Sequence, residues 1–86
     1  MRVYASKPNS KGIYDISVAR DLDKRPGTGK LVGSACKVPV SGKDWFEFSP
    51  SERFAASLAE VAGRHRTMKA LTTAAQEALE RHGFRL

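Results

Sequence analysis

The stretch from Ser49 to Gly83 limits the folds open to this chain more than any other segment, because it carries the signals of two short helices. Ser49 can cap a helix, Pro50 suits the first helical position, and Glu52 can close a capping box. An apolar stripe with helical spacing follows, and Gly63 is a natural stop. The stripe consists of Phe54, Leu58 and Val61.

A second helix is predicted from Thr67, which can cap its N-terminus, to Gly83, which ends it. Helices of this length are not stable alone, so we expect both to pack their apolar faces on the N-terminal half. The face of the second helix follows the period of an α-helix and contains Met68, Leu71, Ala75, Ala78, Leu79 and His82.

The first of these two segments is open to another interpretation. Residues 54–62 also fit a fourth β-strand in which alternate residues point inward. The segment is rich in alanine, which is the best helix former and a poor strand former. Together with the capping box, this composition favours the helix.

The N-terminal half predicts antiparallel β-strands joined by polar turns. Residues 13–20 place Tyr14, Ile16 and Val18 on one face, as a half-buried strand does. The second and third predicted strands are residues 30–40 and 45–48, and residues 2–6 are short and β-prone. The predicted turns are residues 7–12, 21–29 and 41–44. The predicted fold class is α+β: a small antiparallel sheet of three or four strands, followed by one or two C-terminal helices packed on one face.

Residues 30–40 carry further expectations. Gly33 marks a bulge or a close backbone approach, and Pro39 indicates a strand that lies at a sheet edge or ends there. We expect Cys36 to be buried and inert. The apolar face that would bury it contains Val32, Cys36, Val38 and Val40.

The length and the charge of the chain bound its class. Eighty-six residues make one domain, residues 1–86, with the sheet over 1–48 and the helical part over 49–86. The formal net charge is +6. Residues 1–43 hold nine Lys and Arg against three Asp and Glu, whereas residues 44–86 hold six of each. This asymmetry predicts an anionic partner, unless it serves only solubility.

The sequence also indicates a compartment. Cys36 is the single cysteine, which excludes an internal disulfide and suits a reducing environment. No apolar run approaches the roughly 20 residues of a membrane span, and the first residues lack the apolar core of a signal peptide. We therefore expect a cytoplasmic protein.

No motif for catalysis or cofactor binding is found. Residues 26–30 look like a phosphate-binding loop but fail its spacing, because Lys24 stands where a glycine is needed. His65, His82 and Cys36 cannot be expected to complete a tetrahedral metal site. We expect no catalytic residue, cofactor, metal or small-molecule ligand, and therefore no enzyme.

Basic side chains are the candidate binding residues. A helix-turn-helix is a further interpretation, with residues 63–66 as its turn and residues 67–83 as its recognition helix. Tyr4, Tyr14 or Trp45 could stack on bases if any of them faces outward. The candidates for contact with a partner or a nucleic acid are Lys7, Lys11, Arg20, Lys24, Arg25, Lys30, Lys37, Lys43, Arg64 and Arg66.

A resemblance to a known family is carried by residues 12–21 (GIYDISVARD) and 31–35 (LVGSA). These segments resemble the opening hairpin of some small phage anti-CRISPR proteins, in which a compact antiparallel sheet is followed by an Ala-rich helix. The long loop over residues 21–29 and the second predicted helix depart from that pattern. The resemblance implies a non-enzymatic inhibitor that docks on a CRISPR complex in the host cell cytoplasm, and it carries over no site residue.

Two functions follow as expectations. The first is a non-enzymatic phage or mobile-element protein that inhibits a host nucleic-acid-handling complex by docking on an acidic surface of a protein or ribonucleoprotein. The alternative is an accessory protein that binds a DNA or RNA backbone with its Lys- and Arg-rich N-terminal half. Neither function involves a membrane.

Overall fold

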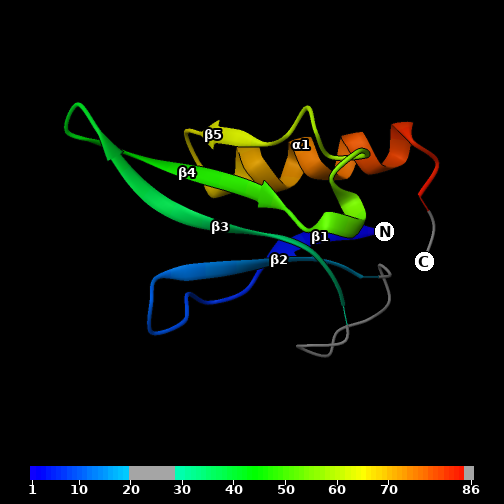
Figure 1. Cartoon of the computed structure of the whole chain (residues 1–86), viewed down its shortest axis with the longest axis horizontal. Coiled ribbons are helices and arrows are strands. Elements are labelled where there is room, and N and C mark those ends of the chain that lie inside the picture. The colour runs from blue at the N-terminus through cyan, green and yellow to red at the C-terminus, as the bar shows by residue number, and fades with distance from the viewer. Residues whose placement is uncertain (20–28, 85–86) are drawn as a thin grey trace.

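A five-stranded antiparallel sheet and one α-helix make up the computed structural model, which describes residues 1–19 and 29–84 (Figure 1). The sheet is a meander, because its spatial order β1-β2-β3-β4-β5 is also the order of the strands along the chain. The elements are β1 (Arg2–Ala5), β2 (Ile13–Ala19), β3 (Lys30–Val40), β4 (Lys43–Pro50), the 3-10 turn η1 (Glu52–Phe54), β5 (Gly63–His65) and α1 (Met68–Arg81). The α+β class is confirmed, with five strands where three or four were predicted.

Helix α1 forms where the sequence predicts it. The Thr67 hydroxyl accepts a hydrogen bond from the Ala70 amide at 3.1 Å, and Gly83 follows the helix with a φ of 70°. Its buried face contains Leu71, Ala75, Ala78 and Leu79. His82 was expected on that face and is exposed. Among the described residues, no helix has the length and apolarity needed to cross a bilayer.

The helix covers the concave side of the curved sheet. It packs against β1, β4 and β5, so it spans the two edge strands. The Val3 amide on β1 donates to the Gln76 side-chain oxygen on α1 at 3.3 Å, which gives an edge-strand amide a partner. The core between helix and sheet includes Val3, Ile16, Val18, Val32, Phe48, Leu71 and Leu79. The other face of the sheet, away from α1, we call the open face.

The helix predicted from Ser49 to Ala62 is absent. Strand β4 continues through Pro50, because Ser49 pairs with Ser34 on β3 and its backbone is committed to the ladder. The chain then forms η1 and a series of separate turns, with neither an α-helix nor a fourth strand over residues 54–62. The predicted stripe is still buried and consists of Phe54, Leu58 and Val61. The apolar spacing was therefore a correct signal of burial and a wrong signal of helix.

A bulge in β3 changes which residues face the core. Ile16 pairs with Gly33 and Ser17 pairs with Leu31, so Val32 is an extra residue on β3. Beyond the bulge Gly33 and Ala35 are buried, whereas Cys36 is exposed. The predicted common face of Val32, Cys36, Val38 and Val40 is therefore wrong, because a one-residue insertion reverses the faces of a strand.

Candidate functional site

The meander collects alternate connections at one end of the molecule. The β1–β2 turn, the β3–β4 turn and the β5–α1 link all lie there, on the left of Figure 1, while the N-terminus and the C-terminal end of α1 lie on the right. We define the turn end as residues 6–15, 36–47 and 64–69. The opposite end holds residues 51–62 and the C-terminus of α1.

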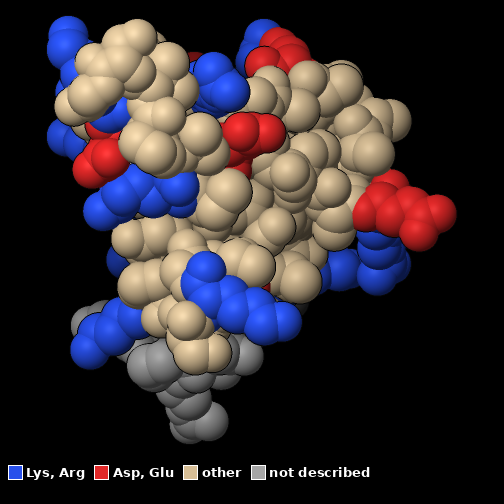
Figure 2. Space-filling view, turned by 60° about the vertical axis from the view of Figure 1, so that its left-hand side comes forward, with Lys and Arg blue, Asp and Glu red and all other residues tan. Residues whose placement is uncertain are grey.

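Basic side chains gather at the turn end. Seven exposed Lys and Arg residues lie there, namely Lys7, Lys11, Lys37, Lys43, Arg64, Arg66 and Lys69. They are accompanied by three acidic residues, Asp15, Asp44 and Glu47. Figure 2 brings this end forward and shows Lys and Arg side chains at the left margin and lower edge, and others at the top and right with Asp and Glu beside them.

The other described charges balance. Four basic residues, Arg2, Lys30, Arg53 and Arg81, stand against four acidic residues, Glu52, Glu60, Glu77 and Glu80. Among the described residues, the positive excess is therefore confined to the turn end. In the sequence, the excess of positive charge lies in the first half of the chain. In the fold, it lies at the turn end, where Arg64, Arg66 and Lys69 of the second half also contribute to it.

The β3–β4 hairpin extends beyond β2 as an arm, residues 37–46, in which only Phe46 also pairs with β5. The last pair between β2 and β3 is Ile13 with Cys36, so the described part of β3 beyond it pairs only with β4. Ser41 and Gly42 both have positive φ, 52° and 79°, which is the signature of a tight type I′ turn. Pro39 lies in this arm, where its missing amide costs no bond to β2, as the edge prediction required.

Trp45 and Arg66 meet on the open face of this arm. The register places Trp45 opposite Val38 on β3, and Arg66 follows directly after β5. The Arg66 Cζ atom lies over the indole, 5.6 Å from the ring centroid, and its Nη1 donates to the Asp44 carbonyl. Sequence reasoning missed this pair, because residues 63–66 were assigned to a turn between two helices.

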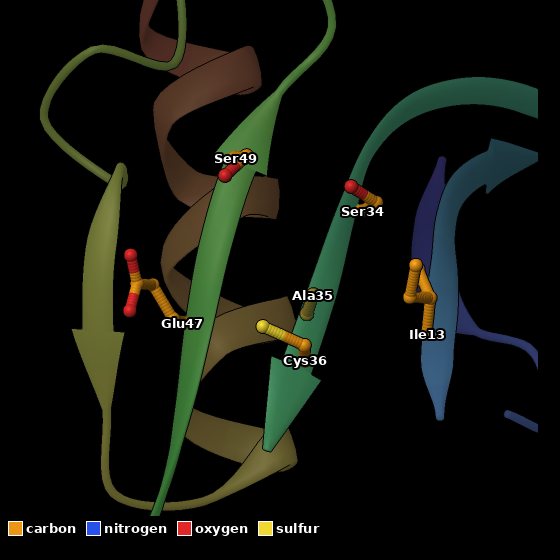
Figure 3. A pocket seen from close by; sticks show the side chains of 6 residues that line it. All are labelled: Ile13, Ser34, Ala35, Cys36, Glu47 and Ser49. Atoms are coloured by element: carbon orange, nitrogen blue, oxygen red, sulfur yellow. The ribbon is translucent and has the colours of Figure 1, made fainter. Parts of the chain in front are cut away.

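A shallow hollow of about 80 Å³ lies beside the arm on the open face (Figure 3). Ile13, Ser34, Cys36, Glu47 and Ser49 line it, from three neighbouring strands, with α1 behind the sheet. The Arg64 Nε atom lies 3.8 Å from the Glu47 carboxylate at its edge.

The two histidines lie elsewhere. His65 pairs in register with Phe46, and its Nε2 atom lies 2.7 Å from the Val61 carbonyl oxygen. The neighbouring pair in the register, Glu47 with Arg64, faces the open side. His82 lies at the opposite end, 3.9 Å from a Glu60 oxygen. In the part of the chain that the structure describes, neither histidine side chain lines the hollow that holds the two serine hydroxyls and the thiol. Residues 1–19 and 29–84 hold no group of three or more His, Cys, Asp or Glu able to bind a metal ion.

The structure settles the position of some predicted residues and not of others. Tyr14 packs edge-on against Phe46 at 5.9 Å and is not an outward platform, while Arg2 lies over Tyr4 at 5.7 Å. Lys30 opens β3 at the opposite end. Candidates Arg20, Lys24 and Arg25, and most of the loop compared with a phosphate-binding motif, lie outside the described residues.

The helix-turn-helix interpretation is wrong for this chain. Residues 63–65 form strand β5, and no α-helix precedes it within the described residues. Gln76, on the proposed recognition helix, accepts a hydrogen bond from Val3 and faces the sheet edge.

Comparison with known proteins found no family model, no curated protein and no solved structure that matches this chain. The chemistry of its own surface is therefore the basis for a functional proposal.

Proposed function

We propose that this chain is a non-enzymatic binding protein whose turn end contacts the phosphate backbone of a nucleic acid. The observation that carries this proposal is the concentration of seven exposed Lys and Arg side chains at one end, against three acidic ones. Phosphate backbones release condensed counterions when cations bind them, and this release drives association without any sequence reading.

Three separate segments supply the charge. Lys7 and Lys11 come from the β1–β2 turn, Lys37 and Lys43 from the arm, and Arg66 from the end of β5. Each is exposed, so a phosphate can approach without the loss of a buried contact. The ladders of the sheet hold the three segments relative to one another, so the charges are fixed at one end of the molecule rather than on independent flexible tails. Within that end Lys37 lies on the face of Phe46, with its Nζ atom 6.0 Å from the ring centroid, and Lys43 lies on the open face.

The acidic residues in this surface are partly matched already. Arg64 lies 3.8 Å from Glu47, and both side chains are about half exposed, at 53% and 45%. An exposed pair of this kind contributes little to stability but lowers the local repulsion that a phosphate would meet. The remaining basic side chains therefore dominate the field at this end.

The test measures binding of labelled single-stranded DNA, duplex DNA and RNA at about 50 mM and 200 mM salt, the range over which backbone binding weakens steeply. The informative variant is Lys37→Gln with Lys43→Gln. The control, Arg53→Gln with Arg81→Gln, removes the same charge from the opposite end. We expect the arm variant to lose affinity and to reduce the salt slope by about 0.9 per lost phosphate contact on duplex, or about 0.7 on single strands.

Two results would contradict the proposal. One is the absence of nucleic-acid binding at low salt, and the other is an equal loss in the arm and control variants. An acidic host protein or ribonucleoprotein as the partner, which the anti-CRISPR resemblance predicts, would give no DNA or RNA binding together with capture of a protein that depends on Lys37 and Lys43. That inhibitor function stays a prediction.

A further inference from the structure

We propose that Arg66 and Trp45 form a stacking site for one unpaired base, so that the chain takes single-stranded nucleic acid in preference to duplex. This inference rests on the proposed backbone contact and names the strand state that it favours.

Arg66 is held over Trp45 at two points. Its guanidinium carbon lies 5.6 Å from the indole centroid, and Nη1 donates to the Asp44 carbonyl on the same strand as the ring. A guanidinium held in this way loses little side-chain freedom when a ligand arrives. Arg66 is exposed and Trp45 is half-buried, so the pair presents surface to solvent on the open face.

Base stacking is the chemistry that suits this pair. Unpaired bases stack on aromatic rings and on arginine guanidinium planes, and the contact tolerates any base because every base has a π-face. Paired bases inside a duplex have both faces covered by their neighbours. A stacking site therefore adds affinity for single strands and none for duplex.

The surroundings of Trp45 support the same choice of ligand. Lys43 lies on the same face two residues earlier in β4, roughly 7 Å away along an extended strand, where it can meet a phosphate of the stacked nucleotide. Phe46 on the other face is not equivalent, because its ring is engaged edge-on by Tyr14 at 5.9 Å. Trp45, with Arg66 over one side of its ring, is therefore the aromatic residue of the arm on the open face.

The experiment uses the intrinsic fluorescence of Trp45, the single tryptophan in the chain. An unstructured oligothymidylate and a duplex of equal length are titrated at about 50 mM salt, where backbone binding is strong. We expect the single strand to quench or shift the emission and to bind more tightly. The duplex is expected to leave the emission nearly unchanged.

Variants separate stacking from charge. Arg66→Lys keeps the cation but removes the planar guanidinium, and Trp45→Ala removes the platform. Each is expected to lower single-strand affinity about tenfold while duplex affinity stays within about twofold. Lys43→Gln is the charge control and should lower the affinity for both nucleic acids, because it removes a cation and leaves the stacked pair in place. Trp45→Phe keeps an aromatic ring in place and is expected to retain most of the single-strand preference, while Arg66→Lys keeps the test valid if Trp45→Ala does not fold.

The outcomes distinguish the two proposals. Binding to both nucleic acids with a single-strand preference that Arg66→Lys and Trp45→Ala leave unchanged overturns the stacking site and keeps the backbone contact. Equal affinity of the parent chain for both strand states does the same. No binding to either nucleic acid at low salt overturns both proposals.

Discussion

Gly33 lies so close to Phe48 that a side chain cannot stand between them. A Cβ atom on Gly33 would come within 2.6 Å of the Phe48 ring and of the Ser49 carbonyl. Phe48 is itself buried in the core, at 2% exposure. This contact explains why a glycine follows the bulge in the middle of an eleven-residue strand.

Gly33→Ala is therefore expected to destabilise the protein by about 3 kcal/mol, the upper part of the range for an overpacked core. Urea unfolding followed by circular dichroism measures the change. Ser34→Ala, one residue along on the open face, is the control and should stay within about half a kcal/mol. Similar effects of the two substitutions would mean that Phe48 does not pack on Gly33 as described.

Leu71→Ala and Leu79→Ala should each cost about 2–5 kcal/mol, because both side chains are fully buried between α1 and the sheet. Thr73→Ala, on the exposed side of the same helix, should change the free energy of unfolding by no more than about half a kcal/mol. A loss below half a kcal/mol at either leucine would contradict the packing of α1.

Thr67→Ala and Ser49→Ala should differ, although the sequence predicts a helix cap at both. The Thr67 hydroxyl accepts from the Ala70 amide, so its loss should cost about 1 kcal/mol. Ser49 lies on the exposed face of β4, and its removal should cost less than half of that. Thermal or urea unfolding of the two variants measures both losses of stability. An equal loss at both positions would mean that Ser49 also caps a helix.

Cys36 should react rapidly with a thiol reagent in the folded protein, because it is exposed on the open face rather than buried. The chain unfolded in guanidinium chloride provides the reference rate. Protection of the native thiol by a large factor would show that the bulge at Val32 does not reverse the faces of β3 as described.

The local pattern of the sequence was enough for much of this fold. Residues 30–40 form β3 with the predicted bounds, and α1 begins after the predicted cap at Thr67. Alternation and helical spacing are properties of neighbouring residues, so they act before any long-range contact is made. The same reasoning identified Lys37, Lys43, Arg64 and Arg66 as candidates from their charge alone.

The tertiary structure decided the outcome where a local signal competed with strand pairing. Ser49 and Pro50 carry a local signal for a helix start, but their backbone pairs with β3, and the ladder outweighs a single cap. The exposure of Cys36 depends on one extra residue in β3, which no local pattern reveals.

The candidate site divides in the same way. The sequence determined the charge of the chain. The concentration of basic side chains at the turn end depends on which strands pair. The contact between Arg66 and Trp45 depends on the register of β5 on β4. Contacts between residues far apart in the sequence form only when the whole sheet closes. For that reason composition alone indicated a basic protein, and only the fold placed that charge beside a stacking surface.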